Sequence, residues 1–183
     1  LEDAARLQQT VPDLHILHVN IDLDQLLDPG FLTPYETICR QYPEIRVVLE
    51  INELSLRATG GETRADIEKS LRRHQLTVAL DDLGKAYSSL YALAAYPLYS
   101  VKVDKLLLDV FELPRTWDVL GRVVDLAHRL GTHLVFEGVE TAAQERFLHA
   151  LGARYAQGFL FAGPMPVDDL ARLLAAGGGR LPA

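Results

Sequence analysis

Six positions along the chain place a lone acidic, amide or basic side chain at the end of an apolar, strand-like stretch. They are Asn20, Glu50, the pair Asp81 and Asp82, Lys102, Glu137 and Gln157. A single polar group of this kind is costly to bury, so its repetition at the end of one segment after another indicates a shared, charge-compensated site. A metal centre is the kind of site that this pattern favours, because hard divalent cations prefer oxygen ligands.

The stretches that end in these side chains alternate apolar and polar residues, which is typical of strands. Their starts lie roughly 20 to 35 residues apart, which leaves room for a helix and two loops between successive strands. The predicted strands span residues 17–22, 47–52, 77–83, 100–106, 133–139 and 155–161.

The segments between the strands carry helical spacing. Apolar residues from Val119 to Leu130 recur at steps of three and four, and Gly131 can cap the end of that helix. Thr141 is expected to be the N-cap of a second helix, with Gln144 completing a capping box. A third helix is predicted from Asp168 to Ala176, ended by the glycine run at 177–179.

Strand and helix alternate throughout, which predicts parallel strands with right-handed crossovers and hence an α/β sheet or barrel. The apolar flanks of the strands favour burial on both faces. In either architecture the functional groups gather at the carboxyl ends of the strands, and the six polar positions fall at these ends.

Length and composition predict one globular domain over residues 1–183, because a chain of this length with 49% hydrophobic residues can bury a substantial core. The formal net charge of -7 argues against binding of polymeric nucleic acid, which usually requires a basic stripe. A phosphate ligand would need local positive charge, which bound divalent cations can supply.

The sequence also predicts the compartment. Its single cysteine, Cys39, excludes an internal disulfide and fits a reducing environment. No run approaches the roughly 18 apolar residues of a spanning helix, and no signal-peptide pattern opens the sequence. We therefore expect a cytoplasmic protein without direct membrane insertion.

Six short strings make the chain similar to one family. LHVNI, VVLEINE, VALDDLGKAYSSL, VKVDK, VFEGVET and YAQGFLFAGPMP occur in the order and approximate spacing of the EAL domain family. The resemblance covers Leu14 to about Pro166. It implies a modified eight-stranded TIM-type (β/α) barrel that hydrolyses the bacterial second messenger cyclic di-GMP to linear pGpG, using two Mg or Mn ions.

The resemblance also implies the metal ligands. Asn20, Glu50 and Asp81 match the residues that bind one ion, and Asp81 bridges to a second ion that also takes Asp82 and Glu137. Two ions about 4 Å apart can bind both the attacking and the leaving oxygen of the reaction, and water between them loses a proton near neutral pH.

Further roles follow from the same resemblance. Lys102 is expected to point among the carboxylates, to hold the nucleophilic water and to protonate the leaving oxygen. Gln157 would hydrogen-bond the water or a phosphate oxygen, while Gly158 and Pro164 would shape the nucleotide pocket. Glu53 resembles the glutamate that anchors the loop after the paired aspartates and couples metal binding to dimer contacts, so a homodimer is also implied.

The chain departs from the family pattern at two main places. The Glu-x-Leu motif, whose glutamate completes the first metal site, lies in the family on an earlier strand, and no such strand precedes Leu14. We therefore expect a part of a longer protein that lacks about two N-terminal strands of the barrel, which leaves the activity of this chain alone open. The loop after the aspartates reads Gly84, Lys85 and Ala86 where the family usually has Gly-Thr-Gly, which adds a charge near the metals.

Several residues have a purely structural alternative. Asp81 and Asp82 could cap a turn near Gly84, and Lys102 or Glu137 could belong to a structural ion pair. The six histidines show no metal-binding spacing and are assigned to the core or the surface. A nucleophilic serine at positions 88–89 is not expected, because no paired histidine and acid accompany it.

Three functions remain open from the sequence. The first is a metal-dependent cyclic di-GMP phosphodiesterase, because the ligand and catalytic positions are suitably filled. The alternative is a catalytically inactive EAL-like domain that senses cyclic di-GMP or binds a protein partner. A more remote alternative is another metal hydrolase on a similar barrel, since a fold does not determine the substrate.

Overall fold

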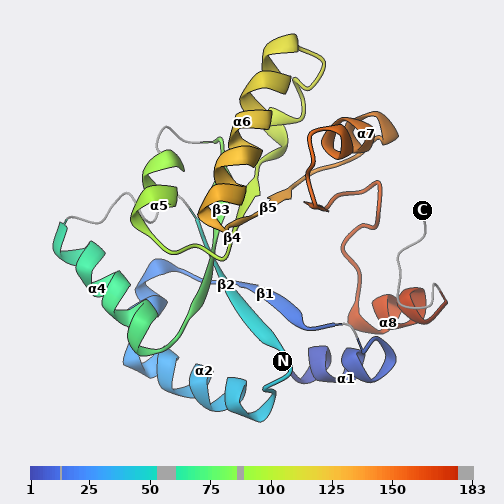
Figure 1. The fold of residues 1–183 in the computed structure, drawn as a ribbon. Helices are drawn as coiled ribbons and strands as arrows, with labels where there is room; N and C mark the ends of the chain where they lie inside the picture. Colours follow the sequence, from blue (N-terminus) through green and yellow to red (C-terminus); the bar gives the residue numbers. More distant parts are fainter. Residues whose placement is uncertain (13, 53–60, 86–88, 177–183) are drawn as a thin grey trace. The chain divides into compact units, whose positions relative to one another are not determined.

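The computed structural model describes residues 1–12, 14–52, 61–85 and 89–176 of the chain (Figure 1). The chain divides into two compact units. The first unit comprises Leu1–Glu50, Thr59–Thr77 and Gly163–Ala183, and the second comprises Ile51–Ala58 and Val78–Ala162.

The first unit contains two parallel strands and four α-helices in its described residues. Its elements are α1 (Glu2–Thr10), β1 (Ile16–Asn20), the 3-10 turn η1 (Leu23–Leu26), α2 (Pro29–Gln41), the greater part of β2 (Arg46–Asn52), α4 (Gly61–Arg73) and α8 (Val167–Ala176). β1 pairs with β2 in parallel, and Asn20 lies opposite Glu50. The parallel register therefore brings two predicted metal ligands to the same level of adjacent strands.

The two strands of the first unit differ in burial. In β2, the side chains from Val47 to Ile51 are all buried, as expected for a parallel strand covered on both faces. In β1, Ile16 is 41% and Val19 is 38% exposed. The expectation of burial on both faces is therefore wrong for β1, because the strand pairs only with β2 among the described residues.

Within the residues that the structure describes, the second unit carries the four parallel strands β3 to β6 in chain order. Its elements are the end of β2, nearly all of β3 (Thr77–Leu83), α5 (Ser89–Ala95), β4 (Ser100–Val103), the turn η2 (Lys105–Leu107), α6 (Pro114–Leu130), β5 (His133–Phe136), α7 (Ala142–Ala150) and β6 (Tyr155–Ala156). β3 pairs with β4, β4 with β5 and β5 with β6, each in parallel. Crossover helices are needed to join strands of this kind, which explains the alternation along the chain.

The helices α6 and α7 form where the sequence predicts them. Gly131 ends α6 in the left-handed conformation at a φ of 70°, and Thr141 and Gln144 form the capping box of α7. The buried face of α6 includes Leu120, Val124 and Ala127. Val119 and Leu130 are 55% and 49% exposed, so their assignment to that face is wrong, because they lie at its edge in a helix of 3.6 residues per turn.

Four strands are shorter than predicted, and the first of them, β1, ends at Asn20 instead of residue 22. β4 ends at Val103 because the Asp104 side chain accepts a hydrogen bond from the backbone of Leu106 and starts η2. β5 ends at Phe136, ahead of Gly138 with its φ of 68°. β6 ends at Ala156, and residues 158–162 form turns instead. Glu137 and Gln157 therefore stand in the loops that directly follow β5 and β6, whereas Lys102 lies within β4.

The predicted C-terminal helix is confirmed as α8, which starts one residue earlier than expected. The glycines at 177–179 lie outside the described residues. No helix in the described part of the chain combines the length and the apolar character that crossing a membrane requires.

Candidate metal centre

Asp81 and Asp82 stand at an irregular place near the end of β3. The pairing with β4 changes register between Leu80 and Leu83, and Asp82 has a φ of 66°. In a regular strand, consecutive side chains point to opposite faces. The register shift and the left-handed residue instead bring both carboxylates together, at a strain of roughly 1 to 2 kcal/mol for a residue other than glycine.

Glu137 joins these two aspartates in what we call the carboxylate cluster. Each of the three residues offers one carboxylate oxygen, and these oxygens lie within 4.8 Å of one another. Glu137 directly follows β5, where its backbone N–H donates to the carbonyl oxygen of Val103 over 3.0 Å. Three half-buried oxygen donors at this spacing fit a divalent cation, because hard cations such as Mg²⁺ and Mn²⁺ bind through carboxylate oxygens.

Lys102 lies among these carboxylates. Its Nζ is 2.9 Å from Oε1 of Glu137 and 3.6 Å from Oδ1 of Asp81, and its side chain is 11% exposed. Its neighbours Val101 and Val103 are fully buried on the other face of β4. The period of two along a strand thus turns the lysine toward the cluster, where its charge offsets part of the carboxylate repulsion.

Gln157 approaches the cluster from the loop after β6. Its Nε2 donates a hydrogen bond to Oε1 of Glu137 over 2.6 Å. Next to it, a Cβ on Gly158 would lie 2.2 Å from the carbonyl oxygen of Val139, so only glycine fits this close backbone approach. Gly158 therefore lets the loop carrying Gln157 pass against the loop that carries Glu137.

Asn52 and Asp104 are not among the predicted site residues, but both contact side chains at the cluster. Asn52 donates from Nδ2 to Oδ2 of Asp82 over 2.7 Å, and Asp104, which is 4% exposed, receives Lys85 at 2.9 Å. Asn52 stands two positions after Glu50, at the end of β2, and Asp104 stands two positions after Lys102, directly after β4. The period of two that directs Lys102 inward was therefore the available signal for both.

Asn20 and Glu50 belong to the first unit, as does Pro164. Glu50 is 4% exposed, and its Oε1 lies 2.7 Å from Nδ1 of His18. His18 is a surface residue, as predicted, and it also contacts a predicted metal ligand. A metal site that combines Asn20 and Glu50 with Asp81 remains a prediction.

Other assigned residues lie outside the described part of the chain. These are Glu53, expected to anchor a loop, and Ser88, together with Ala86 of the altered loop. The role of Glu53 therefore remains a prediction.

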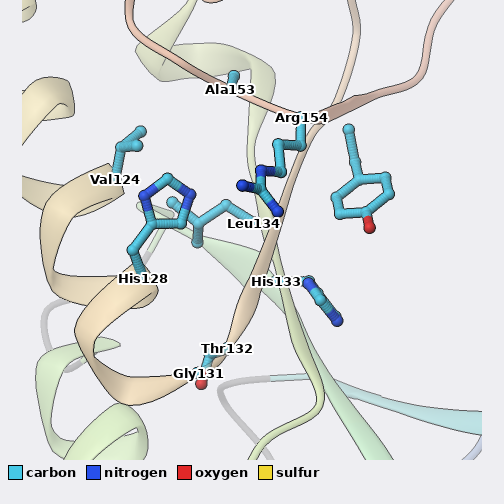
Figure 2. Close-up of a pocket in the computed structure, with 9 residues that line it drawn as sticks. Val124, His128, Gly131, Thr132, His133, Leu134, Ala153 and Arg154 are labelled. Carbon is cyan, nitrogen blue, oxygen red and sulfur yellow. The ribbon is translucent and has the colours of Figure 1, made fainter.

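A separate cavity of about 160 Å³ lies at the opposite ends of the strands in the second unit (Figure 2). It is lined by residues that include His128, Thr132, His133 and Arg154, and His133 and Tyr155 are the first residues of β5 and β6. Catalytic groups of parallel α/β folds stand at the carboxyl ends of strands. The carboxylate cluster, at those ends, is accordingly the better candidate for chemistry.

Comparison with known proteins agrees with the resemblance seen in the sequence. A profile of the EAL domain matches residues 1–164. The cyclic di-GMP phosphodiesterase PdeL of Escherichia coli (strain K12) is 29% identical over 163 residues, which cover 87% of this chain and 45% of PdeL. The chain spans less than half the length of the curated relatives that it matches.

Solved structures give the same result for the fold. The EAL domain of Mycobacterium smegmatis DcpA has a TM-score of 0.84 and 30% identity, with 98% of this chain and 81% of that chain covered. A manganese and cyclic di-GMP complex of Klebsiella pneumoniae BlrP1 has a TM-score of 0.75 and 28% identity, with 89% and 42% covered. The predicted α/β fold, a partial barrel of parallel strands, is confirmed. The chain belongs to the EAL domain family.

Proposed function

We propose that the protein is a metal-dependent phosphodiesterase that hydrolyses cyclic di-GMP to linear pGpG. The observation that carries the proposal is the carboxylate cluster with Lys102 between Asp81 and Glu137. A cluster of oxygen donors with an inserted ammonium group suits phosphoryl transfer, which needs cations and a proton donor near the phosphate. PdeL is named for this activity, and BlrP1 was solved with manganese and cyclic di-GMP.

Two divalent ions, Mg or Mn, complete the proposed centre. Asn20, Glu50 and Asp81 would hold one, and Asp81, Asp82 and Glu137 the other. When bound, the ions supply a water activated for attack and positive charge beside the phosphate oxygens. The side-chain donors are carboxylates and one amide, which match the ligand preference of these hard cations.

The residues of the second unit have separate roles in the proposed reaction. Hydrolysis adds water across one phosphodiester bond, so the departing ester oxygen must gain a proton. Lys102, with its Nζ at the cluster, orients the attacking water and donates that proton. Gln157 holds the carboxylate of Glu137 in place through its 2.6 Å hydrogen bond.

The remaining assignments form part of the proposal. Gly158 and Pro164 would shape the nucleotide pocket, and Glu53 would anchor the loop that follows the aspartates. We also propose one domain over residues 1–183, a homodimer and a cytoplasmic location, the last because a single cysteine suits a reducing compartment.

The test is conversion of cyclic di-GMP by the purified protein with Mn²⁺ or Mg²⁺, followed by chromatographic detection of pGpG. We expect product with either ion, none with a chelator, and loss of turnover in Glu137→Ala. The matched control is Glu145→Gln, which changes an exposed glutamate of α7 and should keep wild-type turnover. Tight binding of cyclic di-GMP without product in both metals would contradict the enzyme and favour an inactive sensor.

A further inference from the structure

Lys85 joins two carboxylates at the edge of the cluster. Its Nζ lies 2.5 Å from Oδ1 of Asp82 and 2.9 Å from Oδ2 of Asp104. Its ammonium group is positively charged near neutral pH, as lysine side chains ordinarily are. The single negative charge of the Asp82 carboxylate cannot fully compensate both this ammonium group and a metal ion.

A tight turn directly after Asp82 sets the position of Lys85. Gly84 has a φ of 108°, and the Lys85 backbone N–H donates to the carbonyl oxygen of Asp82 over 3.2 Å. Because of this tight turn, the Lys85 side chain lies against Asp82 at the end of β3. Its charge is therefore placed at the cluster by local backbone geometry.

The charges of the surrounding side chains show what the lysine does electrostatically. The cluster and Asp104 supply four carboxylates, and Lys85 and Lys102 supply two ammonium groups. Lys102 is 11% exposed and belongs to the proposed reaction, whereas the side chain of Lys85 is 49% exposed and can swing into water. Of these two lysines, Lys85 is therefore the one whose ammonium group can move away from the cluster when a metal ion binds.

We propose that Lys85 is a built-in counter-ion that competes with divalent metal for the Asp82 carboxylate and so raises the metal concentration at which the centre loads. This inference rests on the proposed function, since it concerns the same site. A neutral residue at position 85 leaves one more uncompensated negative charge at the cluster. Removing one positive charge a few ångströms from a divalent ion in a water-exposed site should tighten its binding about tenfold.

The proposal predicts opposite changes in two measurements, a lower thermal stability without metal and a tighter binding of metal. A lysine with a purely structural role would not produce this combination. Without metal, loss of Lys85 leaves Asp82 and the buried Asp104 without this counter-ion, so thermal stability should fall. With metal, the same change should improve binding. A lysine that only holds the loop in place would lower both the stability and the affinity.

The experiment measures Mn²⁺ binding directly, by electron paramagnetic resonance of free Mn²⁺, in the purified wild-type protein and three variants. Lys85→Met removes the charge and keeps the length, while Lys85→Arg keeps the charge. Lys69→Met, which changes an exposed lysine of α4, controls for net charge alone. Thermal melts in chelator and in saturating Mn²⁺ accompany each titration.

We expect Lys85→Met to bind Mn²⁺ about tenfold more tightly and to melt earlier in chelator, while Lys85→Arg and Lys69→Met stay near wild type. Measurable Mn²⁺ binding in Lys85→Met, with none in the wild type or the other two variants, would also support the proposal. Unchanged or weaker binding in Lys85→Met overturns it, as does absence of binding in every variant. Formation of pGpG is read separately, so wild-type turnover with unchanged Mn²⁺ affinity in Lys85→Met would reject only the role of Lys85.

Discussion

The Nζ atom of Lys102 lies 2.9 Å from Oε1 of Glu137, a residue that follows the neighbouring strand. The same Oε1 accepts the hydrogen bond from Gln157. One carboxylate oxygen is therefore contacted by an ammonium group and an amide from two different segments. These two contacts hold the Glu137 carboxylate in one orientation.

Lys102→Met should lower turnover of cyclic di-GMP by at least about 100-fold, because general acid-base groups contribute factors of this size or more. Lys102→Arg should recover little, since a guanidinium group does not release its proton. The measurement is the rate of pGpG formation under saturating Mn²⁺. Turnover within threefold of wild type in Lys102→Met would exclude the lysine from the reaction.

Asn52→Ala should weaken Mn²⁺ binding about tenfold. The hydrogen bond from Asn52 to Asp82 orients a proposed ligand, and loss of such an outer partner commonly costs at least this factor in metal affinity. Isothermal titration with Mn²⁺ measures the effect. Gln41→Ala, which removes an exposed amide at the end of α2, serves as the control and should bind like wild type.

His18→Ala should destabilise the protein by about 1 to 3 kcal/mol, because it removes the 2.7 Å contact between the imidazole and the buried carboxylate of Glu50. Urea unfolding in the presence of chelator measures the change without a contribution from bound metal. His149→Ala, at an exposed position of α7, should change stability much less. Equal stability of the two variants would show that the contact between His18 and Glu50 contributes nothing.

The free energy of unfolding should fall at acidic pH as the Asp104 carboxylate becomes protonated. Burial alone would raise its pKa, but the Leu106 N–H and the Lys85 charge outweigh burial and hold the pKa below its ordinary value of 3.8. A carboxyl whose folded pKa is lowered stabilises the fold above the unfolded value, and this contribution is lost as pH falls toward the folded pKa.

The measurement for Asp104 is unfolding free energy against pH in the wild type and in Asp104→Asn. The difference between the two should be constant from about pH 5 to 7 and should shrink below the ordinary value of 3.8. Asp109→Asn, at an exposed position after η2, is the control. A difference that persists unchanged down to pH 2 would mean that the Asp104 charge does not stabilise the fold.

Calcium should bind to the protein without supporting turnover. Ca²⁺ takes six to eight oxygen ligands at longer distances than Mg²⁺, so it fits a carboxylate site but holds water and phosphate in a looser geometry. We expect Ca²⁺ to raise the melting temperature and to inhibit the Mn²⁺-dependent formation of pGpG competitively. Turnover with Ca²⁺ equal to that with Mn²⁺ would contradict this account of the centre.

Much of this protein was determined by the sequence itself. The period of two along residues 100–103 places Lys102 opposite the buried valines, and the capping box of Thr141 and Gln144 starts α7 as predicted. Patterns of this kind are local, since alternation and capping depend on residues a few positions apart. The sequence also predicts the polar residues at the strand ends, because this pattern too depends on residues a few positions apart.

The tertiary structure alone decided how the carboxylates meet. Alternation along a strand would separate Asp81 from Asp82, whereas the register shift near the end of β3 and the positive φ of Asp82 bring their oxygens together. The contacts of Lys85 with Asp104 and of His18 with Glu50 join residues from different segments. Such contacts depend on strand register and loop geometry, which arise from long-range packing and leave no local pattern in the sequence.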